Sequence, residues 1–195
     1  MTAALLALWL AAAAPPASAS EPRVVSLVPL GNVDPALVKV AAEALQSRLG
    51  HPVRVESPRE LPKSAWNASR KRWRAEKLLE ALDADRPQGA WKVLGLTSAE
   101  LSATKGEVPE RRVRGEGEVG GRVCVASSWS DERDARTKAD LHGRVADLVV
   151  HEVGHTLGLG HCQVKGCVMR AAEARAQEAS TGQPCDACRK KLRSP

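Results

Sequence analysis

Residues 151–162 constrain the fold of this chain more than any other stretch, and they run His-Glu-Val-Gly-His-Thr-Leu-Gly-Leu-Gly-His-Cys. On an α-helix, His151 and His155 lie one turn apart on the same face, so both imidazoles can reach one metal ion. Gly158 permits the positive φ that ends many helices, and the chain can then turn back and bring in His161. The spacing therefore predicts a helix that ends at about Gly158 and a three-histidine metal site.

Glu152 lies between two of the predicted ligands and is not needed as a ligand itself. Three neutral imidazoles leave the metal its full double charge and one open position, which is the arrangement of a catalytic zinc rather than a closed structural one. Three of the five histidines fall within the eleven residues 151–161, so chance is a poor explanation of the pattern. We interpret His151, His155 and His161 as ligands of a catalytic zinc. Glu152 is then placed to accept a proton from a zinc-bound water as the general base.

Four of the five cysteines come at or after the end of this stretch, in an order that ends with a Cys-x-x-Cys pair. This spacing is typical of a tetrahedral four-cysteine zinc site. Two disulfides and one free thiol remain the alternative if the chain is exported to an oxidising compartment. The predicted ligands of a structural zinc are Cys162, Cys167, Cys185 and Cys188. The remaining thiol, Cys124, is expected to be a small buried hydrophobic residue, with a cysteine-switch ligand or a redox sensor as alternatives.

The combined pattern resembles the archaemetzincin family of zinc metallopeptidases, in the metzincin clan. The motif at 151–162 is followed by Cys-x-Met at 167–169 and Cys-x-x-Cys at 185–188. The resemblance implies peptide-bond hydrolysis with two zinc ions, one catalytic and one structural. It also implies that Met169 forms the methionine turn and packs beneath the histidines rather than binding metal. The chain contains no Tyr, so the tyrosine that several metzincins use as a fifth ligand or oxyanion donor has no counterpart.

Glu152 also bears on the competing functions. A catalytically silent, zinc-stabilised binding module that uses its basic surface is the alternative to a zinc metallopeptidase. Glu152 has no structural task in a three-histidine site, so its presence favours turnover. A membrane-anchored peptidase would require residues 1–19 to stay uncleaved, because the chain has no other apolar span. We expect a monomer that acts on a peptide or protein substrate, with no nucleic-acid partner and no stable membrane insertion.

The order of the predicted elements indicates an α/β (α+β) fold. The predicted strands of the first half are at 23–28, 52–56 and 91–96. The first helix begins at Asp34, a good N-cap, with Pro35 next to it, and ends at Gly50, and a second helical stripe covers 75–82. Strands and helices that alternate in this way predict a mixed, mainly parallel twisted sheet with right-handed crossovers. The resemblance implies a single metzincin-like domain over 20–195, with an active-site zinc helix and a small C-terminal four-cysteine zinc subdomain.

The segment before the histidines is expected to be less regular. Residues 98–120 are polar, charged and glycine-rich, which predicts a surface loop near the site. A strand follows within 121–129. In metzincins the strand before the zinc helix forms the upper edge of the sheet and binds extended substrate by strand addition, so the resemblance implies this role for 121–129. The zinc helix is expected to run from about Thr137 or Lys138 to Gly158.

Residues 1–19 have the features of a cleaved signal peptide. Their apolar run is too short to span a bilayer, and Ala17-Ser18-Ala19 is a small-x-small cleavage site. The run is not preceded by Lys or Arg, so an uncleaved anchor or a cytoplasmic leader remains the alternative. We expect an exported protein, periplasmic or secreted, and a cytoplasmic one if these residues are not a signal.

The chain is basic, with a formal net charge of +6. Two basic runs are Arg70, Lys71, Arg72, Arg74 and Lys77, and then Arg189, Lys190, Lys191 and Arg193. Such runs can attract nucleic acid, anionic lipid or acidic peptide. No nucleic-acid motif accompanies them, so we expect a solvated helix face and a solvated tail.

The two predicted metal sites share neighbouring residues. His161 and Cys162 are adjacent, and in an extended segment their side chains point to opposite sides. Cys167 and Met169 repeat this link between the two sites. We therefore expect the four-cysteine site to position the third histidine.

Overall fold

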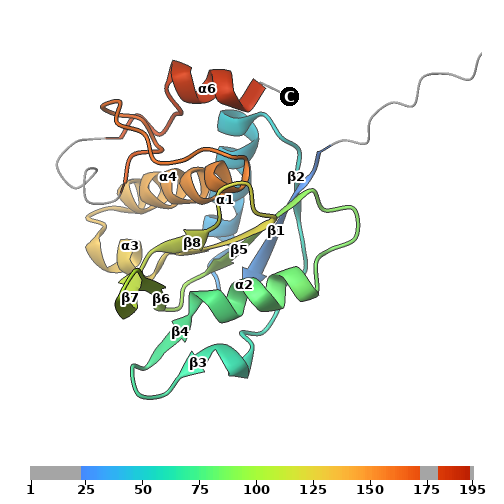
Figure 1. Cartoon of the computed structure of the whole chain (residues 1–195), viewed down its shortest axis with the longest axis vertical. Helices are drawn as coiled ribbons and strands as arrows, with labels where there is room; N and C mark the ends of the chain where they lie inside the picture. The colour runs from blue at the N-terminus through green and yellow to red at the C-terminus, as the bar shows by residue number, and fades with distance from the viewer. Residues whose placement is uncertain (1–22, 172–179, 194–195) are drawn as a thin grey trace, which may run out of the picture.

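A computed structural model describes residues 23–171 and 180–193 of the chain. Its larger sheet has five strands in the order β2-β1-β5-β9-β8 (Figure 1). The four parallel strands are β1 (Val25–Leu30), β2 (Val53–Val55), β5 (Lys92–Thr97) and β9 (Val123–Ser127). β8 (Gly115–Gly117) pairs antiparallel with β9 and forms one edge. β1 and β5 are buried along their whole length, as expected of strands covered on both faces.

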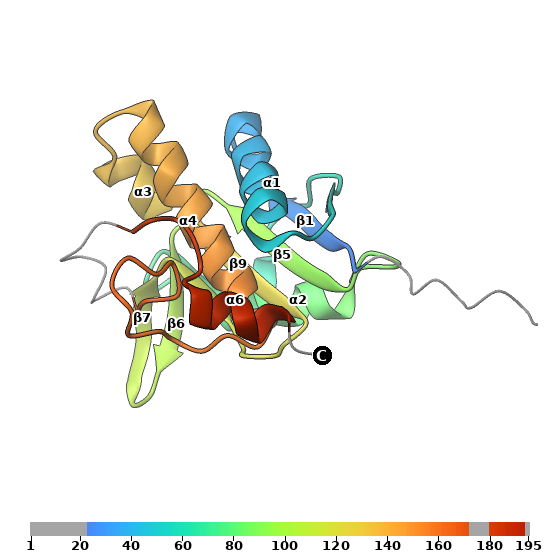
Figure 2. The same ribbon diagram turned by 90° about the horizontal axis from the view of Figure 1, so that it is seen from above.

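Two long helices pack side by side on one face of this sheet (Figures 1 and 2). α1 (Pro35–Leu49) begins where the Asp34 side chain accepts a hydrogen bond from the Ala36 amide at 2.8 Å, and Gly50 ends it with a φ of +73°. Both predicted ends of this helix are confirmed. α4 (Lys138–Thr156) lies next to α1 and carries the motif histidines. The mixed α/β single domain predicted from the sequence is thereby confirmed.

A second, four-stranded sheet and α2 (Ala75–Ala84) cover the opposite face. This second sheet has the order β3-β4-β6-β7, and a short 3₁₀ turn, η1 (Lys63–Ala65), precedes it. Its strands are β3 (Trp66–Asn67), β4 (Arg72–Arg74), β6 (Leu101–Lys105) and β7 (Val108–Val113). Leu101 and Ala103 of β6 are buried against α2 in a core separate from that under α1 and α4.

The prediction that residues 98–120 form a loop is wrong, because they contain β6, β7 and β8. These strands have weak apolar alternation, and several of their charged residues form ion pairs with residues outside their own strand. Glu100, just before β6, forms an ion pair with Arg72 of β4 at 2.8 Å and accepts a hydrogen bond from Arg112 of β7 at 2.5 Å. Pairing between such distant residues leaves no local signal in the sequence.

The assignment of the sheet edge to residues 121–129 is also wrong. β9 lies between β5 and β8, so its backbone is paired on both sides and the edge is β8. The basic run that begins at Arg70 is not a helix face, since Arg72–Arg74 form β4. The second basic run belongs to α6 (Asp186–Arg193) rather than to a tail.

No helix among the described residues has both the length and the apolar character that crossing a membrane requires. The predicted signal peptide, residues 1–19, lies outside the described residues.

Candidate metal centres and active-site cleft

α4 positions two of the predicted ligands and the predicted base. The Thr137 side chain accepts from the Asp140 amide at 3.1 Å and caps the helix where the sequence predicts its start. The helix ends at Thr156, and Gly158 has a φ of +91°. The bend that the glycine was predicted to allow is therefore present. Beyond it, the chain returns with His161 towards the helix.

His151, His155 and His161, hereafter the histidine cluster, converge on one point. Their nearest ring nitrogens all lie within 4.8 Å of one another. The Nε2 atoms of His151 and His155 are 3.0 Å apart, and the His161 ring lies 5.4 Å and 5.0 Å from the other two ring centroids. His151 and His155 are buried, whereas His161 is exposed. The structure thus brings together all three predicted ligands.

Backbone carbonyls fix the tautomers of the two helical histidines. His151 Nδ1 donates to the Val168 carbonyl and His155 Nδ1 donates to the Leu159 carbonyl, both at 2.8 Å. A carbonyl can only accept, so each neutral ring carries its proton on Nδ1 and keeps the Nε2 lone pair. The two Nε2 atoms lie 3.0 Å apart and converge with the His161 ring nitrogen on one point. A cation between them satisfies both, so the residues fit a metal ion such as zinc.

Met169 packs against the backbone of α4. It is fully buried, and a Cβ added at Gly154 would come within 2.5 Å of its sulfur. Gly154 is the residue just before His155, so the methionine packs directly against the helix backbone between the ligands. The Met169 carbonyl also accepts from the Cys162 amide at 2.9 Å, which closes the loop between them.

Glu152 lies at the edge of the larger sheet and is only 6% exposed. A Cβ added at Gly115 of β8 would lie 2.4 Å from its carboxyl carbon, so the carboxylate packs directly against the strand backbone. A cleft of about 610 Å³ is lined by the histidine cluster, Glu152 and β8. The sequence did not identify Gly115 as a site residue, because its role depends on a side chain of a distant helix.

An ion pair fixes the wall of the cleft. Arg114 Nη2 donates to both carboxylate oxygens of Asp131, at 2.5 Å and 2.7 Å, and this links β8 to α3 (Trp129–Asp134). Burial raises the pKa of Asp131, although Arg114 opposes the shift. Arg112 stacks on Trp129 at 4.8 Å, and Lys105 pairs with Glu116. No local sequence pattern identifies this wall.

Cys162, Cys167, Cys185 and Cys188, hereafter the cysteine cluster, also converge, with all four sulfurs within 4.8 Å of one another. The Cys162–Cys185 and Cys167–Cys188 sulfur distances are 3.7 Å and 3.8 Å. A disulfide would need about 2.05 Å, whereas tetrahedral zinc–sulfur bonds of about 2.3 Å place sulfurs roughly 3.8 Å apart. The cluster therefore fits a four-coordinate zinc.

Two thiols of the cysteine cluster have pKa values shifted in opposite directions. A backbone hydrogen bond from Cys188 lowers the pKa of Cys185 to about 7, whereas burial raises the pKa of Cys167. Cys124 is on β9, outside the cluster, and is fully buried. Burial raises its pKa well above the usual range, which agrees with its predicted role as a buried hydrophobic residue.

Fold and site together place the chain among the metzincin-type zinc metallopeptidases. A model of peptidase family M54 matches residues 36–194, and the chain belongs to this family. Because the family is a family of peptidases, its members act on peptide substrates.

Similar proteins support this assignment. The archaemetzincin of Haloarcula marismortui is 31% identical over 152 residues, which cover 74% of this chain and 84% of that protein. The crystal structure of archaemetzincin from Methanopyrus kandleri matches with a TM-score of 0.75 at 28% identity. The match covers 89% of this chain and 94% of the Methanopyrus kandleri chain. The archaemetzincin of Archaeoglobus fulgidus has a TM-score of 0.71 at 26% identity, over 86% of this chain and 99% of its own. The sequence-based recognition of the archaemetzincin family is confirmed.

Proposed function

We propose that this protein hydrolyses peptide bonds at the histidine cluster with Glu152 as the general base. The observation that supports this most directly is the convergence of three histidine side chains with ligand nitrogens within 4.8 Å of one another, two of them oriented by Nδ1–carbonyl hydrogen bonds. A bound zinc ion would act as a Lewis acid that lowers the pKa of water towards about 7 and polarises the scissile carbonyl. A second, structural zinc would be held by the cysteine cluster.

Glu152 is suited to the proton transfers of this reaction. Glu152 lines the same cleft as the histidine cluster, where a general base for this reaction must lie. It would accept a proton from the attacking water and deliver it to the amine nitrogen of the leaving group. Packing against Gly115 restricts the carboxylate to one position, which lowers the cost of orienting it.

β8 is the element we assign to substrate binding. One side of Gly115–Gly117 pairs with β9, and the other side faces the cleft. An extended peptide can add to such an edge through main-chain hydrogen bonds. The two glycines of the strand, Gly115 and Gly117, leave its surface flat beside the histidine cluster.

Metal counting and a peptide-library assay test the proposal together. The purified protein should contain two zinc ions and no disulfides, and removal of zinc by a chelator should abolish cleavage, which added zinc should restore. A protein that holds zinc at both clusters and cleaves nothing in the library would instead support the silent binding module. Against that alternative, Glu152 occupies the cleft and has no role in binding the metal.

We also propose that the protein is exported and loses residues 1–19. The support is the apolar run and the Ala17-Ser18-Ala19 site. N-terminal sequencing of the mature protein should begin at Ser20 or a near neighbour. Recovery of intact Met1 from the cytoplasmic fraction would contradict export.

A further inference from the structure

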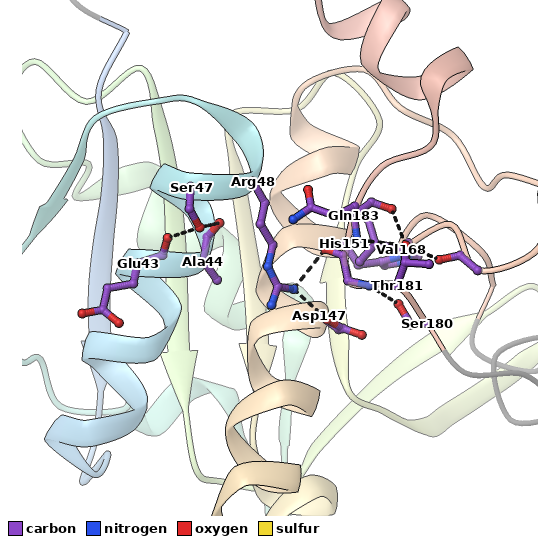
Figure 3. A network of polar contacts seen from close by, with 12 residues as sticks. Glu43, Ala44, Ser47, Arg48, Asp147, His151, Val168, Ser180, Thr181 and Gln183 are labelled. Atoms are coloured by element: carbon purple, nitrogen blue, oxygen red, sulfur yellow. Dashed lines mark hydrogen bonds and ion pairs between the residues drawn. The ribbon is translucent and has the colours of Figure 1, made fainter.

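Arg48 connects three parts of the molecule that are far apart in the sequence. It lies in the last turn of α1, and its Nη1 donates to Asp147 Oδ1 of α4 at 2.7 Å and to the Gly182 carbonyl at 3.0 Å (Figure 3). The Arg48 and Asp147 side chains are only 21% and 20% exposed. Partial burial reduces solvent screening, so this pair interacts more strongly than an ordinary surface ion pair.

Gly182 is shaped to admit the Arg48 side chain. A Cβ at this position would lie 2.6 Å from Arg48 Nη1 and 2.8 Å from Asp147 Oδ1. The residue also has a φ of +71°, which L-amino acids with side chains rarely adopt. Any other residue would therefore displace the guanidinium and strain the backbone.

Hydrogen bonds connect the segment at Gly182 to His151, the first residue of the histidine cluster. The Val168 amide donates to the Gln183 carbonyl at 3.0 Å, and the Thr181 amide donates to the Gly166 carbonyl at 2.9 Å. The Val168 carbonyl in turn accepts from His151 Nδ1 at 2.8 Å. Figure 3 shows Arg48, Asp147, His151 and Val168 in this arrangement. Asp147 lies one turn before His151 on α4. The contacts therefore start and end on α4, running from Asp147 through Arg48, segment 180–183 and Val168 to His151.

We propose that Arg48 is a positioning residue that holds the Val168 carbonyl against His151 and couples the two metal clusters. Segment 180–183 precedes Cys185, and Val168 follows Cys167 directly. A shift of the cysteine cluster would therefore move the Val168 carbonyl, which holds His151. Arg48 anchors this segment to α4 from the other side. The inference rests on the proposed metal site, but it concerns the affinity and orientation of His151 rather than catalysis.

The test compares Arg48→Met with Arg48→Lys. The partners of metal-binding histidines commonly contribute about 10–100-fold in metal affinity. Arg48→Met should weaken the histidine cluster by about that factor and leave the cysteine cluster much less affected. Both contacts come from the single atom Nη1. A lysine ammonium can donate to two acceptors, so Arg48→Lys should recover part of the loss.

Cobalt(II) titration with chelator competition follows each cluster separately, because thiolate ligands give charge-transfer absorption that imidazole ligands do not. The matched control is Lys39→Met on the same helix, whose exposed pair with Glu43 does not contact α4. It should change neither affinity. Arg48→Met should also alter the cobalt spectrum of the histidine cluster, which a general loss of stability would not do.

An unchanged histidine-cluster affinity in Arg48→Met would overturn the proposal, as would an equal loss at both clusters with no recovery in Arg48→Lys. If Arg48→Met does not fold, Gly182→Ala tests the same contact from the other side and should weaken the histidine cluster in the same way. If the parent protein binds no cobalt at the histidines, the proposed function itself fails. The further inference alone fails if the parent protein binds cobalt at the histidines and the variants bind it equally well.

Discussion

The histidine cluster is held by a packed helix, whereas the cysteine cluster is assembled from segments with little regular structure. Two of the three histidines project from buried turns of α4, and carbonyls fix their rings. The cysteines come from the loop after α4, a turn, and the start of α6, and their sulfurs contact one another and nearby backbone amides. Folding alone can preorganise the first cluster, whereas the proposed structural metal would complete the shape of the second. The two clusters thus differ in their support, with a packed helix beneath one and irregular segments around the other.

The largest expected effect tests whether chemistry belongs to the histidine cluster alone. Glu152→Gln keeps the size of the side chain and removes the base, so turnover should fall by about 10²–10⁴, while both metals stay bound. A peptide-library assay with metal counting measures both quantities. Glu118→Gln, which changes an exposed carboxylate nearby, is the control and should retain turnover. Equal turnover in Glu152→Gln and the parent would remove Glu152 from the mechanism.

A second change disturbs the rigid surroundings of Glu152 without altering the carboxylate. The added methyl group of Gly115→Ala would lie 2.4 Å from the Glu152 carboxyl carbon, so the side chain or β8 must move. A displacement of about 1 Å at a catalytic group can lower the rate roughly 10²-fold. The assay is steady-state peptide cleavage at saturating zinc.

The matched glycine for this experiment is Gly143, on the exposed side of α4 with no atom within 4 Å of an added Cβ. Gly143→Ala should stabilise the helix by about 1 kcal/mol and leave turnover unchanged. If Gly115→Ala also leaves turnover unchanged, the close packing of β8 on Glu152 is not part of catalysis.

A third change breaks the cysteine cluster and asks whether the other cluster responds. Cys185→Ser with Cys188→Ser should lose the structural metal. The double variant should also weaken the histidine cluster by about 10–100-fold, because His161 adjoins Cys162 and the Val168 carbonyl holds His151. Chelator competition measures each metal, with Cys124→Ala as the thiol control outside the cluster. An unaffected histidine cluster would show that the two are neighbours without coupling.

The same contrast explains how much of the molecule could be predicted from its sequence. The ends of α1 and α4 were predictable because Asp34, Gly50 and Thr137 act on adjacent residues. The ligands were predictable because helical spacing and Cys-x-x-Cys spacing are local. By contrast, the contacts of Arg48 span 99 and 134 residues of sequence. β6 to β8 were missed for the related reason that their charged residues pair with partners in other strands, which a linear pattern does not record.

The smallest expected effect concerns the side chain of Met169, which supports α4 through packing. The Met169 sulfur packs directly against the helix backbone at Gly154, and the Met169 side chain is fully buried. Met169→Leu nearly conserves volume and removes the sulfur, so unfolding free energy should fall by less than about 1.5 kcal/mol. Metal affinity at both clusters should stay within about threefold, since the change is smaller than those that shift affinity tenfold or more. Thermal unfolding of the metal-loaded and metal-free proteins measures the first quantity, and chelator competition the second. Selective loss of the histidine-cluster metal at unchanged stability would mean that the sulfur acts on the metal, and that Met169 is more than a packed support beneath the helix.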